Sequence, residues 1–145
     1  MTDFSQNKDL PRGLRQNNLG NIRPSTKYQW NGQIGIKDNY VVFSDVEHGI
    51  RAMAKDLLSK IKRGLDTLDK YIPVYSPDGD GANDQNAYIN AMVKSTGFKP
   101  DTILSPDYYT LTKLVKGHIG VENGSKYAAL VPEEAINLGV TMALT

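Results

Sequence analysis

The chain of 145 residues contains no cysteine, which excludes disulfide bonds and thiolate metal sites. It also lacks any apolar run of about 18 residues, so no segment is expected to insert into a membrane. Charge of neither sign dominates, because the chain has 17 Lys and Arg residues and 16 Asp and Glu residues, which gives a net charge of +1. No dense basic run occurs, so a nucleic-acid partner bound through charge is not expected.

Motifs of several catalytic classes are also missing. The two histidines form no HExxH motif, and there is neither a GxSxG motif nor a thiol nucleophile. The acidic stretch from Asp78 to Asp84 suggests a calcium loop. The positions that require an acid or amide, a glycine and a glutamate instead hold Ala82, Asn83 and Ile89. We therefore expect no metal and no cofactor.

Apolar periodicity and turn-forming residues predict one domain with a mainly helical, α+β fold. Alternating apolar residues around an Asp-Asn turn predict a short β-hairpin between Trp30 and Phe43. Apolar residues at helical spacing predict helices over residues 46–63, 66–72, 85–95, 105–122 and 132–143. Residues 1–12 are polar and are expected to form a flexible segment ahead of the domain, which comprises residues 13–145.

Cap residues predict where two of these helices begin. Ser44 and Glu47 have the spacing of a capping box, which predicts Ser44 as the N-cap of the first long helix. Ser105, Pro106 and Asp107 predict a cap, a first-turn proline and a carboxylate that suits the helix dipole. Proline ends most helices, so the short helix from residue 66 is expected to stop before Pro73.

The helix that ends near residue 122 carries a carboxylate on its apolar face. Leu111, Val115, Ile119 and Glu122 are spaced by four, four and three residues, so a helix places them on one side. Burial and the C-terminal end of a helix both disfavour the charged form of a carboxyl group. A protonated acid there can donate its proton to a leaving oxygen. The alternative is a glutamate paired with a lysine or arginine, and His118 one turn earlier is either its neighbour or structural.

Five motifs follow one another along the chain. RGLRQNNLGNIR occupies residues 12–23, WNG residues 30–32, FSDVEHGIRA residues 43–52, SPDGDGANDQNAYI residues 76–89 and VENG residues 121–124. They resemble, in the same order, motifs of phage-encoded lysozyme-like proteins, some of them virion structural proteins. In that group the first motif reads RGxRNNNPGNIR and the last reads HENG. The resemblance covers almost the whole chain.

The chain departs from the family pattern at four positions. Leu19 stands where the family has proline, and Val121 stands where it has the histidine of HENG. Ala82 and Gln85 replace a glutamate and a threonine of the fourth motif. None of these changes removes Glu122, but they alter the polar neighbours that the resemblance implies for it.

The order of two motifs implies a permuted fold. Lytic transglycosylases and glucosaminidases of the lysozyme superfamily have a helix that ends in an HE[ST]G-like motif, followed by an NNPGN-like segment. Here NNLGNI comes first and VENG comes late, so the resemblance implies a circularly permuted lysozyme-like fold; permutation is tolerated when domain termini lie close together. It implies that Glu122 is the general acid of glycosidic cleavage. It also implies that Asn17, Asn18 and Asn21 line the facing wall and bind sugar groups.

Three further residues are candidates for the same site. Asp38 in the hairpin turn is a candidate second carboxylate, which glycoside hydrolysis usually needs, although a turn aspartate requires no function. Without a second acid, the resemblance implies a lytic transglycosylase, in which the N-acetyl group of the sugar stabilises the intermediate. Tyr88 either binds sugar, steadies the acid or is buried with its hydroxyl satisfied. Trp30 either stacks on a sugar ring or belongs to the core.

The resemblance implies a phage peptidoglycan-degrading glycosidase, either an endolysin or a virion-associated muramidase or lytic transglycosylase. It would cleave the bond between N-acetylmuramic acid and N-acetylglucosamine, as a monomer whose partners are a glycan strand and phage virion or tail components. The first residues lack an apolar signal core, so we expect synthesis in the host cytoplasm and delivery to the periplasm or cell wall by a holin or the virion. The alternatives are a virion structural protein with little or no activity and a glycan-binding module without chemistry.

Overall fold

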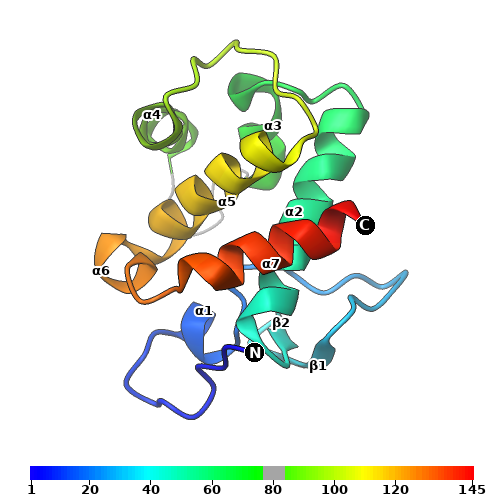
Figure 1. Ribbon diagram of the computed structural model, residues 1–145, viewed down its shortest axis with the longest axis vertical. Coiled ribbons are helices and arrows are strands. Elements are labelled where there is room, and N and C mark those ends of the chain that lie inside the picture. The colour runs from blue at the N-terminus through cyan, green and yellow to red at the C-terminus, as the bar shows by residue number, and fades with distance from the viewer. Residues whose placement is uncertain (77–83) are drawn as a thin grey trace.

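The computed structural model describes residues 1–76 and 84–145, which form seven helices and one two-stranded hairpin (Figure 1). The predicted mainly helical α+β fold is confirmed. In chain order the elements are α1 (Arg12–Arg15), β1 (Gln33–Lys37), β2 (Tyr40–Phe43), α2 (Val46–Lys62), α3 (Leu68–Tyr75), α4 (Gln85–Thr96), α5 (Tyr108–Asn123), α6 (Ser125–Ala128) and α7 (Glu133–Leu144). Residues 77–83, which include most of the acidic stretch weighed as a calcium loop, lie outside the described residues.

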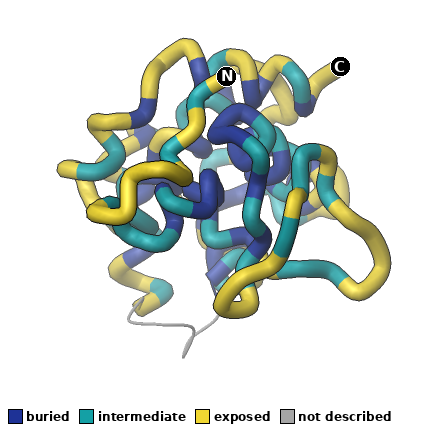
Figure 2. The backbone as a smooth tube through the Cα atoms, turned by 90° about the horizontal axis from the view of Figure 1, so that it is seen from below, coloured by how far each residue is buried: buried dark blue, intermediate teal, exposed yellow. Residues whose placement is uncertain are grey.

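Helix α5 lies at the centre of the helical bundle. It packs between α4 and α7, and α2 packs against both α5 and α7 (Figure 1). The predicted apolar stripe of α5 faces this centre, since Leu111, Val115 and Ile119 are almost completely buried. Figure 2 shows that buried stretches of the backbone lie toward the inside and that exposed stretches form the outer loops. One continuous hydrophobic core therefore sets the position of the C-terminal turn of α5.

The hairpin is a small wing attached beside this bundle. β1 and β2 pair antiparallel, with Lys37 opposite Tyr40 across the turn. Asp38 and Asn39 both have positive φ, 55° and 64°, as a tight type I′ turn requires. β2 buries alternate residues against the domain, whereas the apolar side chains of β1 are exposed.

Two predicted helix caps are wrong by one or two residues. The N-cap of α2 is Asp45, whose carboxylate accepts the His48 N–H, and not Ser44. The capping box does not form, because the carboxylate of Glu47 instead accepts hydrogen bonds from the backbone and hydroxyl of Thr2. The N-cap of α5 is Asp107 and not Ser105, since the Asp107 side chain accepts the N–H of residue 110.

The prediction that the third helix stops before Pro73 is also wrong. α3 continues through Pro73 to Tyr75, and the Ser76 N–H still donates to the Ile72 carbonyl at 2.8 Å. Proline removes one backbone hydrogen bond from a helix. Tyr71 and Ile72 are completely buried, so tertiary packing of α3 outweighs this loss.

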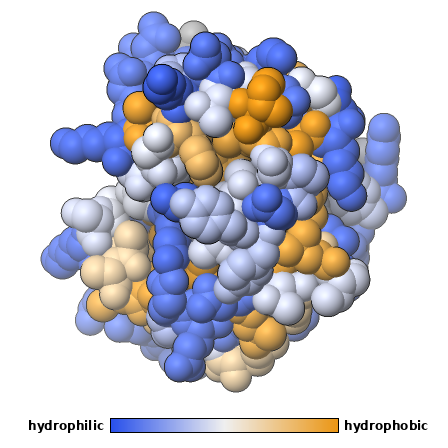
Figure 3. Space-filling view, turned by 45° about the horizontal axis from the view of Figure 1, so that its top comes forward, coloured by the Kyte–Doolittle hydropathy of each residue, from blue (hydrophilic) through white to orange (hydrophobic). Residues whose placement is uncertain are grey.

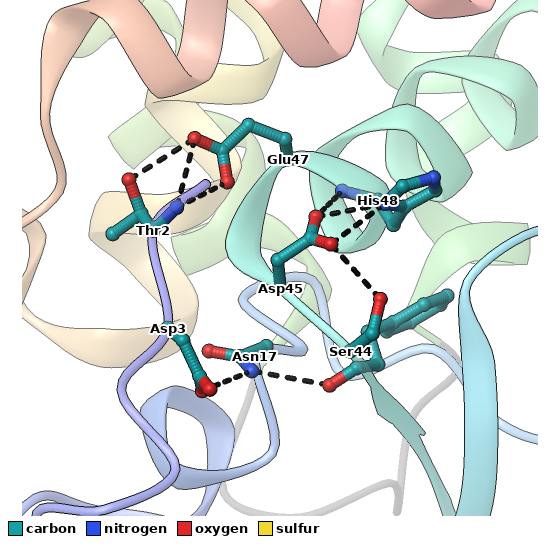
Figure 4. Close-up of polar contacts among 8 residues, drawn as sticks. Thr2, Asp3, Asn17, Ser44, Asp45, Glu47 and His48 are labelled. Carbon is teal, nitrogen blue, oxygen red and sulfur yellow. Dashed lines mark hydrogen bonds and ion pairs between the residues drawn. The ribbon is translucent and has the colours of Figure 1, made fainter.

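The first residues of the chain are attached to the start of α2 (Figure 4). The Thr2 N–H donates to Glu47, and the Val46 N–H donates to the Thr2 carbonyl at 2.7 Å. The Phe4 N–H donates to the side-chain oxygen of Asn17 at 2.9 Å. The expectation that residues 1–12 are flexible stays a prediction, but these contacts fasten the first four residues to the domain.

The surface shows no single dominant apolar face in the view of Figure 3, where hydrophobic patches are separated by hydrophilic side chains. Exposed apolar side chains such as Ile34, Ile103 and Tyr109 come from different elements. Among the helices within the described ranges, none has the length and apolarity needed to cross a bilayer.

Candidate active site

Two motifs that are about a hundred residues apart in sequence meet at the end of α5. Glu122 is half-buried there, and its Oε1 accepts a hydrogen bond from the Asn21 side-chain nitrogen at 2.6 Å. The neighbouring Asn123 side chain donates to the Leu19 carbonyl at 2.8 Å. The helix ends directly afterwards at Gly124, whose φ of 81° favours glycine. The VENG motif and the NNLGN loop are therefore joined side by side.

Backbone geometry explains why this loop is rich in asparagine. Asn17 and Asn21 have φ values of 54° and 53°, in the left-handed region that asparagine tolerates better than most residues. The side chain of Asn18 closes the loop, because its nitrogen donates to the carbonyls of Ile22 and Val41 at 2.9 Å. The loop is thus held to strand β2 on one side and to α5 on the other.

Glycines of the motifs allow close packing around the same loop. A Cβ atom on Gly20 would lie 2.4 Å from the Met53 side chain and 2.9 Å from the Tyr75 hydroxyl. A Cβ atom on Gly49, early in α2, would lie 2.0 Å from the Asn17 carbonyl oxygen. Any side chain at either position would push the loop away from α2 and α3.

Two of the asparagines expected to bind sugar serve the fold instead. Asn17 and Asn18 have no exposed surface. The Asn17 side chain accepts from the Phe4 N–H. It also donates to the carboxylate of Asp3 and to the carbonyl of Phe43 (Figure 4). Since the amides of both asparagines are used inside the protein, they shape the loop and do not line a wall for a ligand. Of the three asparagines, the structure brings only Asn21 to Glu122.

An arginine that the sequence analysis missed orients Asn21. Nη2 of Arg12 lies 3.3 Å from the Asn21 side-chain oxygen. A guanidinium only donates, so the amide oxygen must face Arg12 and the NH₂ group must face Glu122. Arg12 stacks 3.4 Å from the ring centre of Tyr40, and the Tyr40 hydroxyl accepts from Arg23. The hairpin therefore contributes to the orientation of the asparagine that binds the carboxylate.

A pocket of about 440 Å³ opens beside Asn21. It is lined by Gly20, Asn21, Ile22, Arg23, Tyr28, Trp30, Asp56, Val74 and Tyr75. Trp30 is half-buried, and Tyr28 meets its ring edge to face at 5.2 Å between ring centres. Aromatic faces beside polar groups suit a sugar ring, so the position of Trp30 agrees with the expectation that it stacks on a sugar, which stays a prediction.

The sequence analysis named Asp38 as the candidate second carboxylate, and the structure adds Asp56 as another. Asp38 is exposed at the hairpin turn and does not line the pocket, whereas Asp56 does. Asp56 pairs with the buried ammonium of Lys60 at 2.7 Å. Burial raises the pKa of the Tyr75 hydroxyl, and the charges of Glu122 and Asp56 raise it further. Both carboxylates therefore lie near one tyrosine of the pocket wall. In the sequence, Asp56 and Lys60 look like an ordinary surface pair on a helix.

Behind Glu122 lies a buried aromatic cluster with a histidine at its centre. The His118 ring is completely buried, and its two nitrogens are each 2.7 Å from a tyrosine hydroxyl, Nε2 from Tyr71 and Nδ1 from Tyr88. Tyr75 stacks on the ring at 4.3 Å between ring centres. Burial, aided by the charge of Lys60, lowers the pKa of His118 to about 3, so the ring is neutral.

Tyr88 belongs to this cluster through its hydroxyl, which is hydrogen-bonded to Nδ1 of His118. Its side chain is buried, and burial raises the pKa of its hydroxyl well above the usual value. The charge of the nearby Glu122 carboxylate adds to this effect. Of the three alternatives, the structure favours the one in which Tyr88 is buried with its hydroxyl satisfied, because the side chain is 2% exposed and the hydroxyl contacts His118.

Comparison with known proteins adds no identification. No protein-family model matches the chain, and no curated protein is significantly similar to it. Within residues 1–76 and 84–145, no three histidine, aspartate or glutamate side chains gather as metal ligands would. The resemblance to phage lysozyme-like proteins stays a prediction from the motifs, and the function must be argued from the site.

Proposed function

We propose that the protein is a phage peptidoglycan-degrading glycosidase with a circularly permuted lysozyme-like fold and Glu122 as its general acid and base. The observation that carries this proposal is the 2.6 Å hydrogen bond from Asn21 to Glu122. It supports the proposal because it joins the two motifs that the resemblance assigns to one active site. It also holds the half-buried carboxyl group of Glu122 against Asn21, which lines a pocket with an aromatic wall, although Glu122 itself is not among the lining residues.

The proposed reaction begins with a glycan strand in the pocket beside Asn21. Glu122 gives its proton to the oxygen between N-acetylmuramic acid and N-acetylglucosamine, and the bond from C1 to that oxygen breaks. The Glu122 carboxylate then takes a proton from a water or from the muramic 6-hydroxyl, and the deprotonated oxygen adds to C1. Asp56, which pairs with Lys60 at 2.7 Å, stabilises positive charge on the sugar ring.

Clearing of peptidoglycan suspensions tests this proposal. Glu122→Gln keeps the size and most contacts of the side chain but cannot donate a proton as an acid. We expect wild type to clear the suspension and Glu122→Gln to be slower by about a hundredfold or more. Glu134→Gln is the matched control, because Glu134 is exposed in the first turn of α7, and it should clear at the wild-type rate. Equal rates for the two variants would exclude Glu122 as the acid.

A second candidate function is a virion structural protein that retains the fold without activity. It is favoured by the structural use of Glu122, whose carboxylate links α5 to the NNLGN loop, and by Val121 in place of the histidine of the family motif. In that case wild type should not clear peptidoglycan, yet Glu122→Gln should still lower thermal stability. Binding to insoluble cell wall without product release would instead indicate a glycan-binding module.

The proposal also covers how the protein reaches its substrate. It acts as a monomer on the glycan strand, with phage virion or tail components as further partners. It is made in the host cytoplasm and reaches the periplasm or cell wall through a holin or with the virion. Light scattering at the concentration used for clearing tests whether the protein is a monomer, and we expect a single species at the monomer mass.

A further inference from the structure

Another pocket, of about 360 Å³, is lined by the N-terminal segment, α1 and the hairpin. It shares no lining residue with the pocket beside Asn21. Three cations from separate parts of the chain line it: Lys8 of the N-terminal segment, Arg15 at the end of α1 and Lys37 at the end of β1. The other lining residues are Ser5, Gln16 and Val42. We refer to it as the basic pocket.

The basic pocket carries positive charge without a matching acid in the described part of the chain. Among residues 1–76 and 84–145, its three cations form no ion pair, and no acidic side chain lines it. Asp9 and Asp38, each next in sequence to one of the lysines, are exposed and lie outside the lining. Asp3 is engaged elsewhere, because its carboxylate accepts from the Asn17 side chain. The pocket therefore concentrates positive charge in a protein whose net charge is only +1.

Hydrogen bonds hold the walls of the basic pocket in place. The Gln16 side-chain nitrogen donates to the Lys37 carbonyl at 3.1 Å, and the Phe43 N–H donates to the Gln16 carbonyl at 2.9 Å. These two bonds fasten the end of α1 to both strands of the hairpin. The Arg15 Nε–H donates to the Leu10 carbonyl at 2.8 Å, which leaves the two terminal nitrogens of its guanidinium for a ligand.

Gln16 also gives the basic pocket an unused hydrogen-bond acceptor. The residue is 4% exposed, and within the described residues no donor reaches its side-chain oxygen. The amide cannot be turned round, because its nitrogen must face the Lys37 carbonyl, which only accepts. A buried acceptor without a donor is unfavourable. A ligand that brings a hydroxyl group as well as negative charge therefore suits this pocket.

Charge and size select the class of ligand. A phosphate monoester carries a charge of about −1.5 to −2 at neutral pH and has three strong acceptor oxygens, which matches three cations better than one carboxylate does. Arginine binds two phosphate oxygens at once through its planar guanidinium. A pocket of about 360 Å³ holds a small molecule, and a polyol phosphate supplies both the phosphate and the hydroxyl.

We propose that the basic pocket binds a small polyol phosphate, with Lys8, Arg15 and Lys37 on its phosphate group and Gln16 on a hydroxyl. Because the two lysines belong to the N-terminal segment and the hairpin, the bound phosphate links these two parts of the chain. The site is separate from the proposed active site and does not depend on the proposed function.

Calorimetric titration of the full chain with glycerol 3-phosphate, at constant ionic strength, tests this proposal. We expect wild type to bind it and not to bind glycerol, which lacks the charge. Arg15→Gln should weaken binding by about tenfold or more, and Lys8→Gln and Lys37→Gln by about threefold each. Lys27→Gln is the matched control and should bind like wild type, because Lys27 is an exposed loop lysine outside the lining. No binding by wild type at millimolar concentration, or equal losses in Lys27→Gln and Lys37→Gln, would overturn the proposal.

The contact with Gln16 is tested with a second ester. Propyl phosphate has the same charged group but no free hydroxyl, and it should bind several-fold more weakly than glycerol 3-phosphate. Equal affinities contradict the contact with Gln16. Vesicles of phosphatidylcholine and phosphatidic acid present a phosphate monoester on a membrane. Binding to these vesicles without binding to glycerol 3-phosphate contradicts a small-molecule site.

Limited proteolysis tests the link between the N-terminal segment and the hairpin. Glycerol 3-phosphate should slow cleavage within residues 1–12 of wild type severalfold, and it should protect Lys8→Gln less, because that variant loses the contact from the N-terminal segment. Unchanged cleavage at a saturating ligand concentration contradicts the link. None of these measurements uses peptidoglycan, so a failure of the proposed function and a failure of this inference are distinguishable.

Discussion

Replacing Asn21 should separate two contributions to the free energy of unfolding, that of its side-chain hydrogen bonds and that of its left-handed backbone conformation. Asn21→Gly keeps a left-handed φ accessible but removes the hydrogen bonds to Glu122 and Arg12. A hydrogen bond to a charged group contributes about 1.5–3 kcal/mol, and we expect the lower end, about 1.5 kcal/mol, because Glu122 is only half-buried. Asn21→Ala loses the same bonds and adds the left-handed penalty for a Cβ atom, about 1 kcal/mol.

Asn39 offers a matched control for the backbone effect. It also has a positive φ, 64°, but it is exposed at the hairpin turn. Asn39→Gly should change the free energy of unfolding by less than about 0.5 kcal/mol, and Asn39→Ala should cost only the backbone penalty of about 1 kcal/mol. The difference between the two positions is therefore the contribution of the Asn21 side chain.

Urea unfolding followed by circular dichroism measures these differences. With a slope of about 2 kcal/mol per molar urea, Asn21→Gly should lower the midpoint by about 0.7 M, and Asn39→Gly should leave it unchanged. The clearing rate of Asn21→Gly should fall on the order of tenfold or more, because the carboxylate loses the group that orients it. If Asn21→Gly unfolds at the wild-type midpoint, the contact between the two motifs does not stabilise the fold, and the argument for a built site fails.

The structure makes three further predictions. Asp56→Asn should slow clearing by about tenfold or more while Asp38→Asn clears like wild type, because only Asp56 lines the pocket; comparable losses in both would contradict this assignment. Asn17→Ala should lower the free energy of unfolding by roughly 3 kcal/mol, since its amide makes three buried or half-buried contacts, and limited proteolysis should then cut near the N-terminus faster. Histidine in the unfolded chain takes up a proton near pH 6.5, whereas His118 in the folded protein does so only near pH 3. The free energy of unfolding should therefore decline as the pH falls from 6.5 to 3, by at most about 1.4 kcal/mol per pH unit. Urea midpoints of wild type and His118→Gln across this range check the last prediction, and parallel curves would contradict it.

Local sequence signals predicted most of the fold because they reflect local physics. The Asp38–Asn39 turn requires two left-handed residues, and the structure has them. Apolar periodicity located the long helices to within a few residues at each end. The errors arose where tertiary contacts outweighed local preference. Glu47 binds the N-terminal segment and so does not complete a capping box, and α3 continues past Pro73 because Tyr71 and Ile72 are buried in the core.

The candidate site was predictable only in part. The apolar stripe of α5 indicated a half-buried acid at residue 122, and the family resemblance indicated that it meets Asn21. Nothing in the sequence marks Tyr71, which is 47 positions from the histidine that it contacts, or Asp56, whose spacing to a lysine is typical of a solvated helix. Asn17 was misassigned because polarity alone does not distinguish a ligand-binding amide from one that satisfies a buried loop.

The position of Glu122 depends on two supports that act from opposite sides. Packing of α5 in the core brings the half-buried carboxyl group within hydrogen-bonding distance of Asn21, which lines the pocket, and the helix ends directly after it. The hydrogen bond from Asn21 sets its orientation, and Asn21 is in turn oriented by Arg12, which stacks on Tyr40 of the hairpin. The small β wing is therefore part of the support for the acid.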